Sequence, residues 1–261
     1  MKNKNWFSFS IIIFSVALFL IFISSCKKDK PASLQTDTMT DIDGNVYKTV
    51  KIGNQWWMAE NLKVSRYRNG DSVLHVTEIN YMLDSATWNH LSSGAYCIID
   101  NTTETSQNYH GKMFGYLYNW FTVNDARNIA PEGWHVPSDA EWITMEESLG
   151  MNSNEANKVN WRGTNEGNKL KIDGGSKGWN TSSDIYTIWG TNDSGFTALG
   201  GGCCMYNGVC GNPSTFATGF WWTSSPEKDK AFYRYLDYNK PNVFRYYGQK
   251  TYGFSVRLVK D

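Results

Sequence analysis

The chain has 261 residues, with 25 basic and 25 acidic side chains and a formal net charge of zero. This balance, without a basic patch or an acidic run, excludes the charge patterns typical of nucleic-acid binding and of solvating tails. Aromatic residues make up 15% of the sequence and charged residues only 19%, so we expect a core built from rings more than from ion pairs.

The N-terminal segment predicts export and a lipid anchor. A basic start (residues 2–4) precedes an apolar run over residues 6–23, which ends in Ile23-Ser24-Ser25-Cys26. These are the parts of a secretory signal. The cysteine directly behind small residues resembles a bacterial lipobox, in which the thiol is acylated and the chain is cut before it. This predicts a signal peptide over residues 1–25 and lipid attachment at Cys26.

An uncleaved transmembrane helix is the alternative for this segment, because the apolar run is about long enough to span a bilayer. Acylation instead anchors the chain to a membrane without spanning it. We therefore expect a cell-envelope protein, held at the outer membrane and facing either the periplasm or the cell surface. Residues 26–40 are polar and lack periodicity, which predicts a flexible tether. Residues 41–261 are then long enough for one domain with a sizeable core.

The domain is predicted to begin with a meander of short strands. Residues 41–52 alternate apolar and polar side chains around an Asp43-Gly44 turn, and a second turn at Gly53-Asn54 leads into residues 55–58.

The middle of the domain combines weaker signals. Residues 68–93 are predicted to be irregular, with a short helix near residues 81–88, and residues 94–100 to form a strand. Residues 114–126 carry apolar side chains at helical spacing.

The strongest helix signal follows residue 137. Residues 138–141 (SDAE) form a capping box, in which the serine and the glutamate each satisfy a free backbone donor of the first turn. Trp142, Met145 and Leu149 then make an apolar stripe, and Gly150 is suited to end the helix.

The last third predicts loops followed by strands. Residues 152–211 are rich in Gly, Asn, Ser and Thr and are expected to form long loops. Residues 220–223 are predicted as a strand, residues 232–247 as a hairpin and residues 252–259 as a terminal strand. Strands, then helices, loops and strands again indicate an α+β fold rather than alternating βαβ units.

Several blocks, in this order, resemble the Fibrobacter succinogenes major paralogous (FISUMP) domain. They are residues 41–61 (DIDGNVYKTVKIGNQWWMAEN), 115–119 (GYLYN), 130–142 (APEGWHVPSDAEW), 194–199 (SGFTAL), 220–225 (FWWTSS) and 252–261 (YGFSVRLVKD). The resemblance extends from about residue 41 to the end of the chain. It implies a lipoprotein or secreted surface protein, of a family without an established activity.

A more distant resemblance is to the C-type-lectin-like fold of the formylglycine-generating enzyme superfamily. Residues 135–142 are similar to its motif at the start of a helix, and residues 253–257 to its closing strand. It implies short antiparallel strands, one or two helices and long Gly/Asn-rich loops. Leu258 stands where many FISUMP members carry cysteine, so a disulfide at that position is absent. The reactive cysteine pair of the enzymes has no match, and fold alone does not carry function.

Cys97, Cys203, Cys204 and Cys210 remain after acylation, and four cysteines allow three pairings. Cys203 or Cys204 with Cys210 would close a small loop, which export makes feasible. Free thiols are one alternative. A metal site is another, although no histidine is nearby and the spacing is not that of a zinc finger.

No motif predicts catalysis or a bound cofactor. Residues 174–178 (GGSKG) match the letters of a nucleophile elbow but lack its flanking strand and helix. His135 is expected to hydrogen-bond within its own loop rather than to bind a metal. Residues 41–45 place glycine and acidic residues at the wrong positions for an EF-hand and predict a turn. Calcium held by residues 192–194 together with Asp184 is the remaining cofactor alternative.

The paired aromatic residues supply the ligand-binding candidates. Neighbours on a strand face opposite ways, so one ring of Trp56-Trp57 and one of Trp221-Trp222 can face out or into a groove. Flat rings beside polar groups suit stacking on sugars, although rings also fill cores. The candidates are Trp57, Trp222, Tyr233, Arg234, Tyr235 and Arg245.

These observations favour a non-catalytic binding module for a glycan or another surface ligand, held to the membrane by its lipid. A structural or protein-interaction component of an envelope assembly is the alternative. An enzyme is a third hypothesis and would require a pocket in which His, Asp or Cys groups converge.

Overall fold

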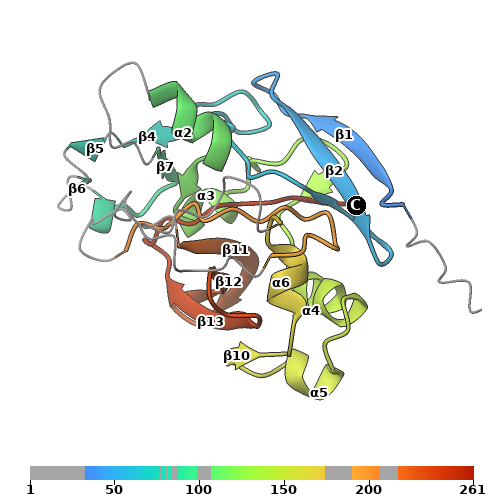
Figure 1. Ribbon diagram of the computed structural model, residues 1–261. Coiled ribbons are helices and arrows are strands. Elements are labelled where there is room, and N and C mark those ends of the chain that lie inside the picture. The colour runs from blue at the N-terminus through green and yellow to red at the C-terminus, as the bar shows by residue number, and fades with distance from the viewer. Residues whose placement is uncertain are drawn as a thin grey trace, which may run out of the picture. The chain divides into compact units, whose positions relative to one another are not determined.

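The computed structural model (Figure 1) describes residues 33–76, 78–79, 82–83, 88–98, 107–173, 190–205 and 217–261. It divides into Met1–Ser33 and Leu34–Asp261, and the fold described is that of the second unit. The predicted signal peptide and Cys26 lie outside the described residues. Within the described ranges, no helix is both long enough and apolar enough to cross a bilayer.

The first sheet has five antiparallel strands in the order β1-β2-β3-β14-β9. They are β1 (Thr36–Thr40), β2 (Val46–Ile52), β3 (Gln55–Met58), β14 (Val259–Lys260) and β9 (Trp134–His135). The predicted meander over residues 41–58 is confirmed. Across it, Thr49 of β2 opposes Asp37 of β1 and Met58 of β3.

The prediction of a tether over residues 26–40 is wrong at its end, because Thr36–Thr40 form β1 and pair with β2. The segment carries a single apolar side chain, Met39, which opposes Tyr47 and is buried with it in the core. A strand with one buried side chain shows almost no alternation of apolar and polar residues. The polar composition of the segment therefore suggested a tether instead of a strand.

The second sheet has four strands in the order β10-β13-β12-β11. They are β10 (Asn160–Arg162), β13 (Val243–Gln249), β12 (Lys230–Asp237) and β11 (Thr218–Glu227). The predicted hairpin is confirmed as β12 and β13. β11 is longer than the predicted strand over residues 220–223, because its pairing with β12 resumes at Pro226 after an irregularity that begins at Trp222.

Two smaller sheets hold the other strands of the described residues. β4 (Leu74–His75), β7 (Ala95–Cys97) and β8 (Leu117–Tyr118) form one, and β5 (Glu78–Ile79) and β6 (Met82–Leu83) form the other. The strand predicted over residues 94–100 is confirmed at its centre, β7. The helix predicted over residues 114–126 is wrong at Leu117 and Tyr118, which instead pair with β7 and are buried there.

The helices are α2 (Gln107–Phe114), α3 (Trp120–Val123), α4 (Asp139–Ser148), α5 (Ser153–Ala156) and α6 (Glu166–Leu170). α4 begins at the predicted capping box, and Gly150 takes a φ of 111° just beyond its end. The prediction of long loops over residues 152–211 is wrong where α5, β10 and α6 lie. Polar residues there act as helix caps, as Asn152 does for α5.

The five-stranded sheet separates two clusters of the core. Met39, Tyr47 and Met58 point to one face. Val50 and Trp57 point to the other, where Trp57 meets Trp142 of α4 with ring centroids 5.0 Å apart. The architecture is α+β, mostly sheet with short helices, as predicted. Alternation along β3 therefore places Trp57 in the cluster with Val50 and Trp56 on the opposite face, half-buried against the cluster with Met58.

Candidate functional site

A pocket of about 240 Å³ lies on the face of the five-stranded sheet that carries Trp56. We call it the first hollow. Every strand of the sheet contributes to its lining, through Asp37 and Met39 of β1, Thr49 of β2, Trp56 of β3, Lys260 of β14 and Trp134 of β9.

The sheet register explains how these side chains come together. Lys260 pairs directly with Trp134 of β9. On its other side, Val259 pairs with Trp57, and the antiparallel register then places Lys260 beside Trp56. The floor of the first hollow is therefore a row across three strands, with a lysine between two tryptophans. Trp56 is half-buried and Trp134 is buried, with 8% of its surface exposed, so each ring is held in place by its neighbours.

A second hollow of about 230 Å³ adjoins the first. Thr40, Pro131 and Glu132 line both hollows, and Ile42, Arg68 and Ile129 are among the residues that line only the second. We call the two hollows together the sheet groove.

Arg68 fixes the wall of the groove opposite β1. Its Nε donates to Ala130 O at 2.7 Å, and its Nη2 donates to Pro131 O at 2.9 Å and to Trp134 O at 3.2 Å. Asn128, at a positive φ of 58°, accepts from Ala130 N at 2.9 Å. Hydrogen bonds from Arg68 and to Asn128 thus fix the wall within the protein itself.

Asp41 lines the second hollow, but its carboxylate makes its hydrogen bonds in and beside the turn that it begins. Its carboxylate accepts from Asp43 N, from Asn45 N and Nδ2, and from the Tyr47 hydroxyl at 2.6 Å. Burial, together with this bond, raises the pKa of Tyr47 above its ordinary value. The prediction of a turn over residues 41–45 is confirmed.

Thr49 carries an unsatisfied polar atom in the lining of the first hollow. The residue is 1% exposed, and its Oγ1 has no hydrogen-bond partner among the described residues. A buried hydroxyl without a partner costs about 1–3 kcal/mol.

Four of the six predicted ligand-binding residues are buried. Trp57, Trp222 and Arg234 are fully buried, and Arg245 is 8% exposed. Trp222 instead supports the core, donating from Nε1 to Tyr118 O at 2.8 Å. None of the four lines either hollow, and their polar groups bond within the protein, so they do not contribute to the sheet groove.

Tyr233 and Tyr235 are half-buried on the second sheet and do not line the sheet groove. Tyr235 packs between Phe220 and Trp161 and donates to Asp237 Oδ2 at 2.6 Å. Burial, reinforced by the Asp237 carboxylate, raises the pKa of its hydroxyl. Both rings therefore belong to a packed aromatic cluster. Sequence reasoning missed the groove residues Trp56 and Trp134.

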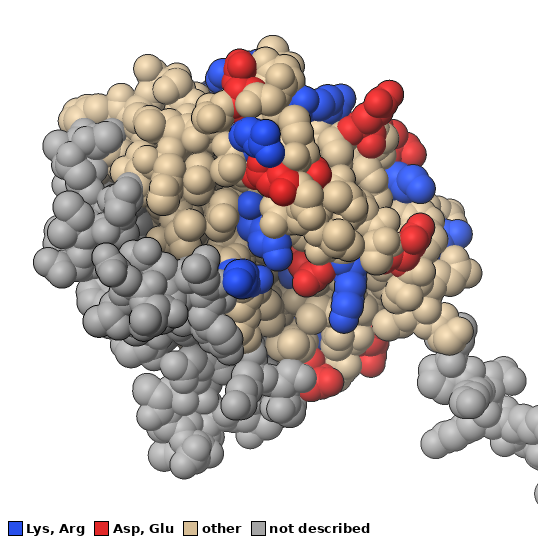
Figure 2. All heavy atoms as spheres, turned by 90° about the horizontal axis from the view of Figure 1, so that it is seen from above, with Lys and Arg blue, Asp and Glu red and all other residues tan. Residues whose placement is uncertain are grey.

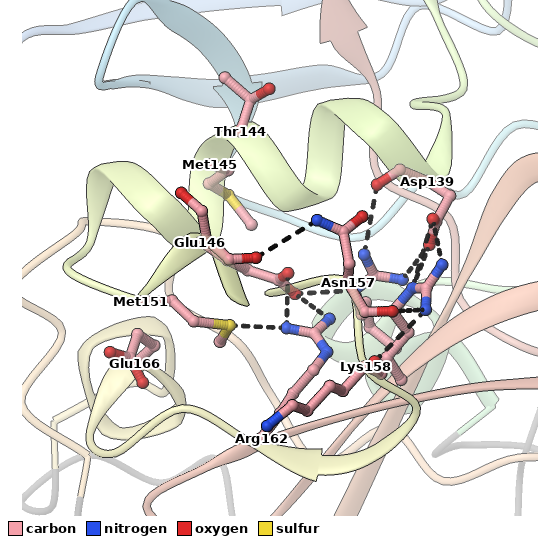
Figure 3. A network of polar contacts seen from close by, with 12 residues as sticks. Asp139, Thr144, Met145, Glu146, Met151, Asn157, Lys158, Arg162 and Glu166 are labelled. Carbon is pink, nitrogen blue, oxygen red and sulfur yellow. Dashed lines mark hydrogen bonds and ion pairs between the residues drawn. The ribbon is translucent and has the colours of Figure 1, made fainter. Parts of the chain in front are cut away.

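Arg234 and Arg245 belong to a buried ion-pair network beneath α4 (Figure 3), which also includes Asp139, Glu146 and Arg162. Arg234 joins the two carboxylates, with Nη1 2.7 Å from Asp139 Oδ1 and Nε 2.7 Å from Glu146 Oε1. Arg245 Nη2 lies 2.7 Å from Asp139 Oδ2, and Arg162 Nη1 lies 2.8 Å from Glu146 Oε2. Burial would raise the pKa of Asp139, but its arginine partners outweigh it and hold that pKa low. The network therefore ties α4 to the second sheet.

His135 joins the start of α4 to the end of the chain. Its Nδ1 lies 2.5 Å from Asp261 Oδ1, and its Nε2 lies 2.7 Å from Glu141 Oε1. Burial would lower its pKa, but the two carboxylates outweigh it and raise the pKa of the imidazole. His135 is hydrogen-bonded, as expected, but its partners lie in α4 and after β14 rather than within its own loop. Because it lies between Trp134 and the end of β14, it also steadies the floor of the first hollow.

Of the disulfide candidates, Cys204 is in a disulfide, Cys203 is a free thiol and Cys210 lies outside the described residues. Cys97 Sγ lies 3.3 Å from Cys204 Sγ. Burial raises the pKa of Cys203 to about 12, so its thiol stays protonated at neutral pH.

Metal ligands do not gather in the parts of the chain that the structure describes, which hold no group of three or more His, Cys, Asp or Glu suited to an ion. Of the predicted calcium candidates, Asp184 lies outside those parts. Asn192 and Ser194 make loop contacts, Asn192 Oδ1 accepting from Thr197 N and Ser194 Oγ donating to Lys169 O.

A family model described as the Fibrobacter succinogenes major domain matches residues 50–260. The match includes Trp56, Trp134 and Lys260 of the groove floor and begins after β1. No curated protein and no solved structure matches the chain.

Proposed function

This chain belongs to the Fibrobacter succinogenes major domain family of surface-associated domains, and we propose that it is a lipid-anchored envelope protein whose sheet groove binds glycans without catalysis. The proposal includes a C-type-lectin-like arrangement, which the short antiparallel strands and short helices support.

The observation that carries the proposal is the first hollow, where Trp56 and Trp134 flank Lys260 near the unpaired Thr49 hydroxyl. Binding sites for small molecules combine apolar and aromatic walls with a few well-placed polar groups. Tryptophan rings offer flat apolar faces to a sugar. A hydroxyl, carboxylates and an ammonium group nearby supply donors and acceptors for sugar hydroxyls.

The charges around the groove favour a ligand without a large net charge. Asp37 and Glu132 line the first hollow together with Lys260. Figure 2 shows basic and acidic side chains interspersed on the face in view, with no field of one sign. A polyanion such as nucleic acid would require a basic stripe.

Replacing Trp56 by alanine is expected to weaken glycan binding about tenfold or more, because the substitution removes one of the two rings at the floor of the groove. The measurement is a glycan array followed by calorimetry on residues 27–261, with and without calcium. Trp161→Ala is the matched control, since Trp161 is also half-buried but lies on β10, outside the groove lining. Equal losses in the two variants, or no binding to any glycan, would remove the proposal.

Thr49→Val tests in the same experiment whether the Thr49 hydroxyl takes part in binding. Valine has the shape of threonine without the hydroxyl, so the free protein should become more stable by up to about 1–3 kcal/mol. If the hydroxyl serves the ligand, the same variant should bind the glycan more weakly. Greater stability with unchanged affinity would mean that Thr49 takes no part in binding.

A role in protein contacts is the second candidate, and it is favoured by exposed apolar side chains near the β1–β2 turn. Ile42 is 40% exposed and Val46 is 58% exposed. Crosslinking in intact cells discriminates, because a stoichiometric protein partner supports an envelope assembly and free monomers oppose it.

Cys26→Ala is expected to abolish incorporation of labelled palmitate and to move the protein from the membrane to the soluble fraction. Cys26 follows the two small residues, Ser24 and Ser25, that come after the apolar run, which is the arrangement that resembles a lipobox. Cys203→Ala is the control and should label normally, because Cys203 lies within the folded domain, far along the chain from the expected acylation site. Unchanged maturation and fractionation of Cys26→Ala would contradict the anchor. Protease treatment of intact cells then reports which face of the envelope carries the domain.

A further inference from the structure

Resting on the proposed function, we infer that the sheet groove binds at least two consecutive units of a glycan chain and discriminates against a single sugar. Glycan binding alone leaves the length of the bound chain open.

The size of the two hollows is the first argument. They measure about 240 and about 230 Å³. Each alone is smaller than the range of about 300–1,000 Å³ that small-molecule sites occupy, whereas together they fall within it. A ligand that used the groove fully would therefore extend from one hollow into the other.

The shared wall is the second argument. Residues 37–40 of β1 line the first hollow, and residues 40–42 line the second, so the groove follows the chain from Asp37 to Ile42. β1 is extended from Asp37 to Thr40 and spans about 10 Å there at about 3.3 Å per residue, which is longer than one sugar ring, and the turn that follows continues the lining to Ile42. Pro131 and Glu132 face both hollows from the opposite side.

The chemistry of the second hollow is the third argument. Its Asp41 carboxylate is already bonded within the turn, and Arg68 is held by three backbone carbonyls of the wall. The apolar side chain of Ile42 remains 40% exposed there. The second hollow thus offers an apolar contact and a fixed cation, but no counterpart to the row of Trp56, Lys260 and Trp134. The second hollow therefore suits the next sugar unit of a glycan whose main contacts are in the first hollow.

The test measures affinity against chain length on residues 27–261. The probes are fragments of one to six units of the polysaccharide that the protein retains, or, if it retains none, the same lengths of neutral glucans, xylans and chitin. Affinity is expected to rise about tenfold from one unit to two or three, a ratio in keeping with covering the exposed part of one isoleucine side chain. Ile42→Glu should remove most of this rise and leave the binding of one unit unchanged.

Val46→Glu is the matched control, because Val46 is also an exposed apolar residue on the first sheet but lines neither hollow. It should leave the whole length series unchanged. Equal affinity for one unit and for six, or an equal effect of Ile42→Glu on both, would overturn the inference while glycan binding stands. Absence of binding at every length would overturn both.

Discussion

Arg234→Ala is expected to lower the free energy of unfolding by about 3–5 kcal/mol, the range for removing one partner of a buried ion pair. Arg234 and Glu146 are fully buried, and Arg234 contacts both carboxylates of the network at 2.7 Å. Without its guanidinium, Glu146 keeps only Arg162 and Asp139 keeps only Arg245 as ion-pair partners within the network. Urea unfolding followed by tryptophan fluorescence gives the change.

Arg66→Ala is the control for this prediction. Arg66 forms an ion pair with Asp43 at 2.6 Å, but its side chain is 44% exposed. Exposed pairs contribute about 0–1 kcal/mol, so the variant should unfold almost as the parent does. A loss below about 1 kcal/mol for Arg234→Ala would contradict the view that the network fastens α4 to the second sheet.

The same residue shows where reasoning from the sequence fails. Arg234 stands between Tyr233 and Tyr235, and arginine among tyrosines is typical of a sugar-binding surface. Which face of β12 is buried depends on α4, whose Asp139 and Glu146 lie far away in the sequence. Alternation along a strand predicts two faces but does not say which of them is covered.

The groove was missed for a similar reason. Alternation predicted that the rings of Trp56 and Trp57 face opposite ways, and that is confirmed, since Trp57 lies in one core cluster and Trp56 packs, half-buried, against the other. The choice between them follows from pairing with β14, which closes the chain about two hundred residues later. β1 gave almost no signal, because Met39 is its only buried residue. The residues next to Thr49 in the sequence do not indicate that its hydroxyl lacks a hydrogen-bond partner. Whether a partner is present depends on residues that are near only in the folded structure.

Elements with local signals were predicted well. The capping box of α4 is complete within residues 138–141, and the hairpin of β12 and β13 has a polar turn between two aromatic runs. Both elements depend on residues that are close in sequence, so they can be predicted without knowledge of the tertiary structure. α5, β10 and α6 are too short to show a period, and the polar composition of their surroundings suggested loops.

The sequence blocks that resemble the family provide buried structural contacts as well as residues of the sheet groove. Asn61 ends the first block, and Arg257 stands in the last. Asn61 Oδ1 accepts from Arg257 Nε at 2.8 Å and from Trp221 Nε1 at 2.9 Å. Its Nδ2 donates to Phe114 O at 2.8 Å and to Ser255 Oγ at 3.2 Å. One buried amide thus joins blocks from the start, the middle and the end of the domain.

Asn61→Ala is therefore expected to lower the free energy of unfolding by about 2–4 kcal/mol, because it strips a partner from two buried donors at once. Burial lowers the pKa of Arg257 to about 9, so its guanidinium stays charged at pH 7 and keeps its need for acceptors. The carbonyls of Phe196 and Thr197 hold its other nitrogens, but Nε would face the space left by the amide. Thermal and urea unfolding measure the loss.

Asn69→Ala is the control, since Asn69 is exposed and bonds only within its own turn, and its effect should stay within about 0.5 kcal/mol. Below its unfolding transition, Asn61→Ala should bind the glycan as the parent does, unlike the weakened Trp56→Ala, because Asn61 lines neither hollow. A stable Asn61→Ala that no longer binds would contradict this separation. It would mean that the residues that join the family blocks also shape the groove, and that the fold and the ligand site cannot be changed independently.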